Sequence, residues 1–281
     1  MSAEVLLNGR FVPYEEAVIS IENRGFQFSE SVYEVIRVYR GRPFELDRHV
    51  RRLQASLEAL GVDLKDGVER LVSQSLELLR RSGLQEASIY LQVTSGEAHR
   101  SHLAPPNLTP TTLAVVTPAS PPPEHVLQEG IKVITVPDTR WALCYVKTTM
   151  LLPNTLARRR AATEGCQDAL FIRDGFLMES TAGNAFVVIN DILHTPPKSN
   201  YILHGITREI LLELAARAGI RFVEGPIAVE KIFSADELFI TGTVSELVPI
   251  TTVDGRTIGN GKPGPMFARL LDLYRRNAIG E

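Results

Sequence analysis

The sequence contains little cysteine: only Cys144 and Cys166 occur among its 281 residues. Two cysteines cannot form a disulfide framework, and no cysteine or histidine spacing indicates a zinc site, so we expect no metal. No apolar run approaches the roughly 18 residues that a membrane-spanning helix needs. The first ten residues lack the basic and then apolar pattern of a signal peptide, so we expect a cytoplasmic protein without a membrane partner.

An excess of charge of one sign is also absent. The 30 lysine and arginine residues nearly balance the 33 aspartate and glutamate residues, which gives a formal net charge of −3. This balance offers no electrostatic reason to bind nucleic acid. The apolar content of 44% and the charged content of 22% are ordinary for a globular protein. At this length two domains are expected, because a single core rarely grows so large.

The stretch Pro118-Ala-Ser-Pro-Pro-Pro-Glu124 is the clearest linker in the chain. Consecutive prolines cannot donate ladder hydrogen bonds and they hold the chain extended, so a domain boundary is expected there. We therefore predict a first domain over residues 1–117, a linker over 118–125 and a second domain over 126–281.

Hydrophobic periodicity predicts helices and strands in both halves, an α/β (α+β) class. In the first half, hairpins are expected at Asn8-Gly9 and Arg40-Gly41, and Asp47 is expected to cap a helix that ends at Gly61. A second helix is predicted over 67–81, and strands over 87–94 and 111–117. The second half is predicted to contain strands at 132–136, 141–149, 169–173, 176–178, 185–189, 237–241 and 248–253, a hairpin at 254–255, and helices at 153–165, 206–218 and 265–276.

Lysine is scarce, with only six residues against 24 arginines. One of them, Lys147, lies in the apolar stretch 141–149. If this stretch is a strand, period-two alternation places Lys147 on the same face as Leu143 and Tyr145. A lysine that is desolvated among apolar neighbours has a lowered pKa and can act as a nucleophile or a base. A lysine at a strand end that reaches solvent is the ordinary alternative.

Three further features follow Lys147 along the chain. Glu179 ends a predicted strand, His204-Gly205-Ile206-Thr207-Arg208 opens a predicted helix, and Thr241-Gly242-Thr243 forms a loop of small donors. The free N–H groups and the dipole of a helix start favour a phosphate. Each feature alone is compatible with an ordinary turn, cap or strand end. Together with a buried lysine they suit an aldehyde cofactor that carries a phosphate and a basic pyridine nitrogen.

Short motifs along nearly the whole chain occur in the same order as the motifs of a known family. They comprise Arg24-Gly-Phe-Gln-Phe28, Val32-Tyr-Glu-Val35, His49-Val-Arg-Arg-Leu53, Ile89-Tyr-Leu-Gln-Val-Thr94, Glu179 with Asn184 and Phe186, Gly205-Ile-Thr-Arg208 and Thr243-Val-Ser-Glu246. The chain resembles fold-type IV (class IV) pyridoxal-phosphate enzymes, which include D-amino acid aminotransferases, branched-chain aminotransferases and aminodeoxychorismate lyases. The D-amino acid aminotransferase branch is the most similar. The resemblance implies an N-terminal α/β domain, a C-terminal pseudo-barrel domain, pyridoxal 5′-phosphate bound between them, and a homodimer.

The resemblance also implies roles for particular residues. Lys147 corresponds to the Schiff-base lysine that carries out the 1,3-proton transfer, and Glu179 to the partner of the pyridine nitrogen. The phosphate contacts are implied to be Arg52, Ile206, Thr207 and Thr243, with Gly242 in the same loop, while Leu203 is implied to pack against the ring. From composition alone Arg52 would be taken for an exposed helix residue.

The segment Ser95-Gly96-Glu97-Ala98-His99-Arg100-Ser101-His102 is the best candidate for substrate recognition. Arg100 and His102 alternate, and an arginine fork can hold a carboxylate with two hydrogen bonds. An isolated pair of this kind is most simply a polar surface loop. The resemblance implies that the pair, completed by Tyr33, binds the substrate α-carboxylate and that Arg100 and His102 reach in from the partner subunit.

The expected reaction is transfer of an amino group from a D-amino acid to a 2-oxo acid, of the D-alanine plus 2-oxoglutarate type. A branched-chain L-amino acid aminotransferase, an (R)-amine transaminase and an aminodeoxychorismate lyase are the alternatives. The sequence departs from the family pattern at 29–31, at 180–183 and at His204, which leaves the side-chain preference open.

Overall fold

The computed structural model describes residues 4–280 of the chain. It divides into two compact units. The first contains the chain up to Ser120 together with the short segment Val146–Met150, and the second contains Pro121–Tyr145 and the chain from Leu151 onward.

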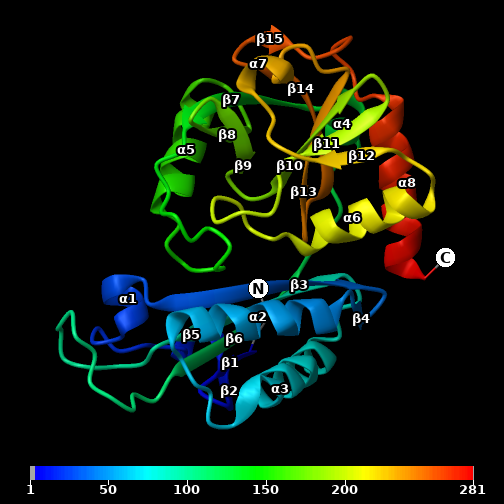
Figure 1. Ribbon diagram of the computed structural model, residues 1–281. Helices are drawn as coiled ribbons and strands as arrows, with labels where there is room; N and C mark the ends of the chain where they lie inside the picture. Colours follow the sequence, from blue (N-terminus) through cyan, green and yellow to red (C-terminus); the bar gives the residue numbers. More distant parts are fainter. Residues whose placement is uncertain (1–3, 281) are drawn as a thin grey trace. The chain divides into compact units, whose positions relative to one another are not determined.

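The first unit is built on an antiparallel sheet with strand order β2-β1-β6-β5-β3-β4 (Figure 1). Its strands are β1 (Glu4–Leu7), β2 (Arg10–Pro13), β3 (Ser31–Tyr39), β4 (Arg42–Pro43), β5 (Ala87–Thr94) and β6 (Thr111–Pro118). Helices α2 (Leu46–Leu60) and α3 (Gly67–Ser82) lie side by side against one face of the sheet. The short 3₁₀ helix η1 (Tyr14–Glu16) and helix α1 (Arg24–Phe28) precede β3.

Both predicted hairpins of the first unit are present. Asn8 and Gly9 have φ angles of 49° and 75°, and Arg40 and Gly41 have φ angles of 50° and 75°. Two successive positive φ angles are what a type I′ turn requires, and this turn matches the twist of the paired strands. The prediction that Asp47 caps α2 was wrong. Glu45 occupies the cap position in a left-handed conformation, and Asp47 lies inside the first helical turn.

The second unit contains a sheet that closes on itself, in agreement with the predicted pseudo-barrel. Its closed path runs through β10 (Asn184–Ile189), β13 (Glu237–Gly242), β14 (Glu246–Val253), β7 (Ile131–Pro137), β8 (Asp168–Arg173) and β9 (Phe176–Ser180). The pairing of Glu179 with Asn184 joins β9 to β10 and completes the circuit. Strands β11 (Ile192–Thr195) and β12 (Phe222–Glu224) extend the sheet beyond β10, and β15 (Arg256–Thr257) pairs with β14.

Five helices belong to the described part of the second unit. They are α4 (Glu124–Glu129), α5 (Leu152–Thr163), α6 (Ile206–Arg217), α7 (Val229–Ile232) and α8 (Pro265–Ile279). The buried rings of Phe186 and Phe239 stack at 5.3 Å, and Phe239 also contacts Phe267 of α8 at 5.8 Å. This aromatic column fastens α8 to the barrel strands by burying large apolar surfaces together.

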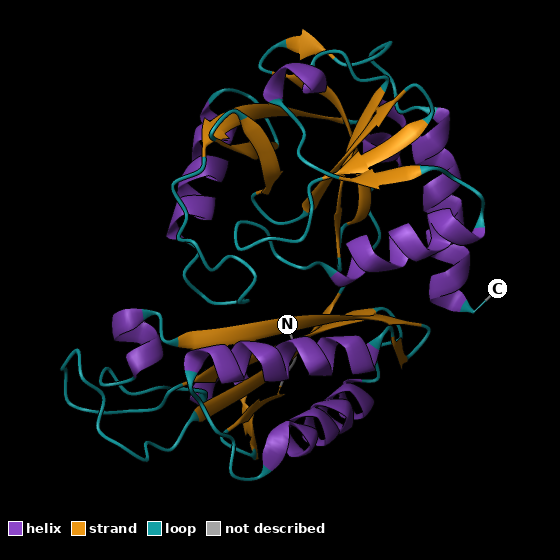
Figure 2. Cartoon of the chain, viewed as in Figure 1, coloured by secondary structure: helices purple, strands orange, loops and turns teal. Residues whose placement is uncertain are grey.

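The expectation of a strand over residues 141–149 was wrong. The segment consists of turns and bends and is drawn as a loop (Figure 2). Its one ladder contact with the described residues is an isolated bridge between Val32 and Thr148. The alternation argument for the surroundings of Lys147 therefore does not apply. None of the helices within residues 4–280 is long and apolar enough to cross a membrane. The cytoplasmic location stays a prediction.

Candidate active site

Lys147 belongs to the first unit, where its segment runs beside the start of β3. The Tyr33 N–H donates to the Lys147 carbonyl at 2.9 Å, and the Thr149 N–H donates to the Ser31 carbonyl at 3.0 Å. The Lys147 N–H in turn donates to Ser56 Oγ of α2 at 3.3 Å. Backbone pairing to an edge of β3, and not membership of a strand of its own, therefore fixes the place of the lysine.

The Lys147 side chain is half-buried and faces an aromatic ring. Its Nζ lies 4.2 Å from the centroid of the Tyr33 ring, and that ring stacks on Tyr90 at 5.7 Å. The Tyr90 hydroxyl donates to Gln92 at 2.8 Å, and burial raises the pKa of Tyr90 to about 12. Two of the sequence-predicted site residues, Lys147 and Tyr33, are thus brought into direct contact.

Arg52, on α2, forms part of a buried charged cluster. Its Nε and Nη2 donate to the two carboxylate oxygens of Glu34 at 2.9 and 2.7 Å. His49 Nδ1 lies 3.3 Å from the same carboxylate. Burial alone would raise the pKa of Glu34, but Arg52 and His49 bring it well below its ordinary value. Burial lowers the pKa of His49. The cluster holds the guanidinium of Arg52 in one orientation, because both of its donors on one edge are occupied.

Arg100 and His102 lie in the long loop between β5 and β6. Both contact the ring of Phe28: the Arg100 guanidinium lies 5.1 Å from its centroid, and the His102 ring lies 5.7 Å away. Both side chains are exposed, and Arg100 has no ion-pair partner within residues 4–280. The pair predicted from the sequence is therefore gathered around one aromatic side chain, and its arginine is free to accept an anion.

Glu179 is buried in the second unit at the closure of the barrel. Its Oε2 accepts the Asn184 side-chain amide and the Leu203 N–H, both at 3.0 Å. Asn184 also donates to the Leu203 carbonyl at 2.9 Å. These three residues form a clamp that joins β9, β10 and the segment before α6, so Glu179 and Leu203 are directly linked.

Arg140 was not expected from the sequence, yet it is the charged partner of Glu179. Its Nη1 bonds Glu179 Oε1, while its Nε donates to Asp138 at 2.9 Å and its Nη2 to the Tyr201 carbonyl at 2.9 Å. Burial raises the pKa of Glu179 to about 7, against the lowering effect of Arg140. Burial would lower the pKa of Arg140, but Asp138 and Glu179 raise it. An Asp-x-Arg triplet after a strand carries no pattern that distinguishes it from a surface turn, so only the fold identifies it.

The helix start that the sequence predicted is present as the first turn of α6. Gly205 is the N-cap and supplies no side chain, and the first backbone-to-backbone bond of the helix is donated by Glu209 to Gly205 at 3.0 Å. The preceding N–H groups of Ile206 and Thr207 have no partner within the helix. Thr207 is itself buried. Ile206 and Thr207 thus present the donors that the sequence predicted.

Gly242 ends β13, and Thr243 follows it in the turn to β14. A side chain at position 242 would lie 2.7 Å from Ser245 Oγ, so the turn is tightly packed. One strand residue earlier, Thr241 Oγ1 is buried and has no hydrogen-bond partner within residues 4–280. A buried hydroxyl without a partner is costly unless a ligand or water satisfies it. The end of β13 therefore has the chemistry of a binding loop.

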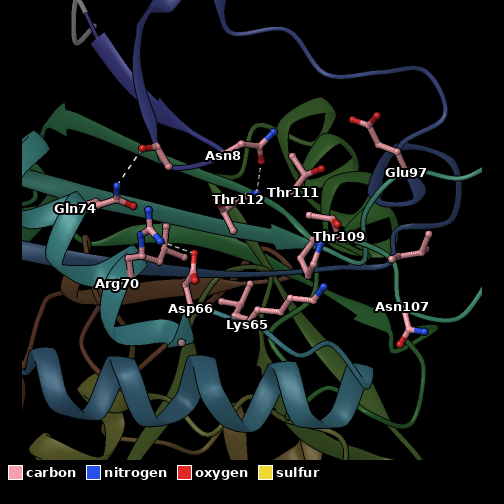
Figure 3. Close-up of a pocket in the computed structure, with 16 residues that line it drawn as sticks. Asn8, Lys65, Asp66, Arg70, Gln74, Glu97, Asn107, Thr109, Thr111 and Thr112 are labelled. Atoms are coloured by element: carbon pink, nitrogen blue, oxygen red, sulfur yellow. Dashed lines mark hydrogen bonds and ion pairs between the residues drawn. The ribbon is translucent and has the colours of Figure 1, made fainter.

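A pocket of about 650 Å³ also opens in the first unit (Figure 3). It lies near the start of α3, where Arg70 pairs with Asp66 and Gln74 bonds the Gly9 carbonyl. None of the sequence-predicted site residues lines it.

The structure gathers the predicted residues in two groups. Those of the first unit are Tyr33, Arg52, Arg100, His102 and Lys147, and those of the second are Glu179, Leu203, Ile206, Thr207, Gly242 and Thr243. The sequence missed the residues that hold them: Arg140, Asn184 as a clamp, and the Glu34–His49 pair beside Arg52.

A comparison with protein families matches residues 31–253 to the class IV aminotransferases. The chain belongs to this family. A family match of this extent includes the Lys147 segment, the barrel closure and the first turn of α6.

Curated relatives match this aminotransferase over nearly its whole length. The D-alanine aminotransferase of Bacillus licheniformis is 38% identical over 278 residues, which is 99% of this chain and 98% of the relative. The D-alanine aminotransferase of Staphylococcus aureus strain N315 is 34% identical over 274 residues, which is 97% of each chain.

Solved structures with a similar fold include branched-chain aminotransferases. The enzyme from Thermoproteus uzoniensis with norvaline has a TM-score of 0.90 at 28% identity, and the match covers 100% of this chain and 96% of that one. A T.th. branched-chain amino acid aminotransferase with pyridoxamine 5′-phosphate has a TM-score of 0.93 at 27% identity, and the match covers 100% and 95%. These likenesses confirm the predicted fold-type IV architecture.

We predict that Gly205→Ala destabilises the aminotransferase through Asn184. A Cβ at position 205 would overlap Asn184 Oδ1, so the amide that clamps Glu179 and Leu203 must move. The expected loss is about 1–3 kcal/mol of unfolding free energy, the usual cost of overpacking. It should appear in thermal unfolding.

Gly225→Ala is the matched control for this substitution. Its Cβ would find only Val223 Cγ1 at 3.5 Å among the described residues, which is an ordinary contact. If the two alanine variants have the same melting temperature, the close approach of Gly205 to Asn184 has no energetic consequence.

Proposed function

We propose that this aminotransferase moves the amino group of D-amino acids, of the D-alanine type, to 2-oxo acids such as 2-oxoglutarate. One observation carries the proposal above the others: Arg100 is exposed, has no acidic partner within residues 4–280, and shares the Phe28 ring with His102. This is an arrangement suited to a small carboxylate. The D-alanine aminotransferases, at 34–38% identity over nearly the whole chain, support the same choice.

The residues present fit pyridoxal 5′-phosphate as the cofactor. A primary amine, a buried carboxylate and an uncapped helix start are the three groups such a molecule needs. The buried hydroxyl of Thr241 has no hydrogen-bond partner among residues 4–280, which supports a bound ligand at the end of β13. We propose that the residues that the sequence predicted as cofactor contacts bind pyridoxal 5′-phosphate.

Lys147 is proposed to join the cofactor covalently and then to act as the base. When bound, the electron-poor ring of the cofactor stabilises the negative charge left at the substrate Cα. The Nζ of Lys147 would take the proton from the substrate Cα and would deliver it to the C4′ carbon of the cofactor, which completes the 1,3-proton transfer. The hydrogen bonds of its backbone to Tyr33 and Ser56 keep the amine in place for both transfers.

Glu179 is proposed to hold a proton on the pyridine nitrogen. A carboxylate in a buried site strengthens its interaction with a nearby cation, because water does not screen the pair. Arg140 and Asn184 fix the orientation of the carboxylate, so that it need not reorganise during the reaction. Leu203, whose N–H also bonds Glu179, is proposed to pack against the ring.

The phosphate is proposed to lie at the first turn of α6. The N–H groups of Ile206 and Thr207 and the helix dipole favour an anion there. Gly242 and Thr243 are proposed to approach it from the end of β13, and Arg52 to contribute the positive charge. The Glu34 carboxylate orients the Arg52 fork for this role.

The substrate is proposed to be held by its carboxylate through Arg100 and His102, with Tyr33 completing the site. A branched-chain L-amino acid aminotransferase is the second candidate, because the solved structures with TM-scores of 0.90 and 0.93 carry that name. An (R)-amine transaminase and an aminodeoxychorismate lyase share the lysine chemistry. The lyase differs in that it needs no amino acceptor.

The choice of substrate is tested with single half-reactions of the purified holoenzyme. D-alanine should convert the bound cofactor at least roughly tenfold faster than L-alanine, L-leucine or an (R)-amine, a difference of about 1.4 kcal/mol in activation free energy. Without 2-oxoglutarate, pyruvate should form only up to one equivalent per bound cofactor, and with 2-oxoglutarate it should continue to accumulate. Faster conversion by L-leucine would assign the enzyme to the branched-chain group instead.

The role of Lys147 is tested by borohydride reduction followed by peptide mapping. The reduced pyridoxyl label should be found on Lys147, and Lys147→Ala should lose both the label and the visible absorbance. Lys132→Ala is the control, because Lys132 is an exposed lysine of β7. A label on another lysine in the unmodified protein would remove Lys147 from the mechanism.

We further propose that the enzyme is a homodimer. Four large apolar side chains of the first unit are strongly exposed, which is unusual for residues of this kind. They are Val18 (76%), Ile21 (77%), Phe26 of helix α1 (73%) and Leu103 (85%). The Ala98 N–H bonds the Glu22 carbonyl at 3.1 Å and ties the loop before α1 to the loop after β5.

Sedimentation should therefore give about twice the chain mass, and Ile21→Glu should lower it toward the monomer, because a charge cannot be buried in an apolar interface without cost. Val223→Glu, at an exposed apolar residue of the second unit, should leave the dimer intact. A monomeric mass for the unmodified protein would rule the dimer out.

A further inference from the structure

Arg24 is a buried arginine that no step of the proposed reaction uses. Its side chain is 1% exposed. The guanidinium forms a two-pronged ion pair with Glu30, with Nε–Oε2 and Nη2–Oε1 distances of 2.6 and 2.5 Å. A donor of a buried guanidinium that finds no acceptor is costly, so the remaining contacts of Arg24 are informative.

Those contacts go to the backbone of the loop that carries Arg100 and His102. Arg24 Nη1 donates to the Ser101 carbonyl at 2.7 Å, and Nη2 lies 3.4 Å from the His102 carbonyl. Residues 99–104 make no backbone-to-backbone hydrogen bond with any other described residue. The guanidinium of Arg24 is therefore the principal polar anchor of this part of the loop.

The ring of Phe28 adds a second, apolar connection. The Arg24 guanidinium lies 4.6 Å from its centroid, while Arg100 and His102 contact the same ring at 5.1 and 5.7 Å. Arg24 and Phe28 are the two ends of α1, so a single short helix holds both the backbone and the side chains of the pair.

Helix α1 is itself firmly placed in the first unit. The Arg24 N–H donates to the Gly96 carbonyl at 2.9 Å, and Asn23 caps the helix through the Gly25 N–H at 3.0 Å. A side chain at Gly25 would lie 2.5 Å from Thr94 Cγ2, so the helix rests directly on the end of β5. Glu30 also accepts the Ser95 hydroxyl at 2.6 Å. The anchor is thus fixed to the strand from which the loop departs.

We propose that Arg24, oriented by Glu30, is a positioning residue for substrate recognition: it holds the backbone of Ser101 and His102 so that Arg100 and His102 meet the substrate carboxylate together. The role of Arg100 and His102 in this statement rests on the proposed function. Without the anchor the loop samples many shapes, and each productive encounter then has to order it again. The loss should fall on carboxylate binding and spare the chemistry at Lys147.

The test compares Arg24→Gln and Arg24→Lys in the full-length holoenzyme. Arg24→Gln should raise the KM for both D-alanine and 2-oxoglutarate by roughly ten- to hundredfold, since small displacements of binding groups cost this much. The kcat and the visible absorbance of the bound cofactor should change little. Inhibition by propionate, which keeps the carboxylate and lacks the amine, should weaken by the same factor as the KM for D-alanine rises. Arg24→Lys should have a smaller effect, because an ammonium keeps the charge and loses the fork.

Arg37→Lys is the matched control. Arg37 is a fully buried arginine of the same unit that also bonds a carboxylate and two carbonyls, those of Glu86, Ala87 and Ala119, none of which lies in the substrate loop. This variant should lose stability without a change of KM. If it raised the KM as much as Arg24→Lys does, the effect would reflect general loosening of the unit and the positioning role would be refuted.

A double-mutant cycle with Arg100→Ala separates the inference from the function on which it rests. Because Arg24 is proposed to act through Arg100 and His102, adding Arg24→Gln to Arg100→Ala should raise the KM much less than it does alone. Full additivity would overturn the positioning role and leave the role of Arg100 standing. An unchanged KM in Arg100→Ala would instead refute the proposed carboxylate site, and the inference with it.

Discussion

The second unit depends on keeping a carboxylate in a place from which water is excluded. Glu179 lies where β9 meets β10, so the strand pairing that closes the barrel also carries the buried charge inside. Such a charge is tolerable only with partners on every side. Arg140, Asn184 and the Leu203 N–H supply them. The strand pairing that closes the barrel therefore also orients Glu179, the proposed partner of the pyridine nitrogen.

Several arginine side chains of this protein are fully buried and hydrogen-bond to carboxylates and backbone carbonyls. Arg24, Arg37 and Arg208 are among its largest fully buried side chains. Each bonds one carboxylate and at least one backbone carbonyl; Arg208, for example, bonds Glu224 at 2.7 Å and the Pro196 carbonyl at 2.8 Å. The planar fork can satisfy several fixed acceptors at once, which a lysine ammonium on a flexible stem does less well. This accounts for the use of arginine where loops must be held without regular secondary structure.

The pKa values of two buried glutamates are shifted in opposite directions by their surroundings. Glu34 faces both Arg52 and His49, and its pKa is brought below the ordinary value, whereas burial of Glu179 raises its pKa to about 7. Glu34 is therefore a permanent anion that orients a cation. Glu179 is poised to respond to a proton on a neighbouring group. Neither behaviour can be assigned from the identity of the residue, because it depends on which partners the fold brings near.

The amino-acid sequence by itself determined most of the regular elements, but not the 141–149 segment, and it made Lys147, Glu179 and the start of α6 candidates for the site. Arg52, Leu203 and Thr243 became candidates only through the family resemblance. Asn-Gly and Arg-Gly turns, helical periodicity in α2 and α3 and the glycine at the start of α6 act locally, so they can be read without the fold. Three features were decided only by the tertiary structure: the surroundings of Lys147, the pairing of Arg140 with Glu179, and the contacts of Arg24 with the loop that carries Arg100 and His102. Each joins residues far apart in the chain through hydrogen bonds and ion pairs, and such contacts leave no periodic signal in the segments that make them.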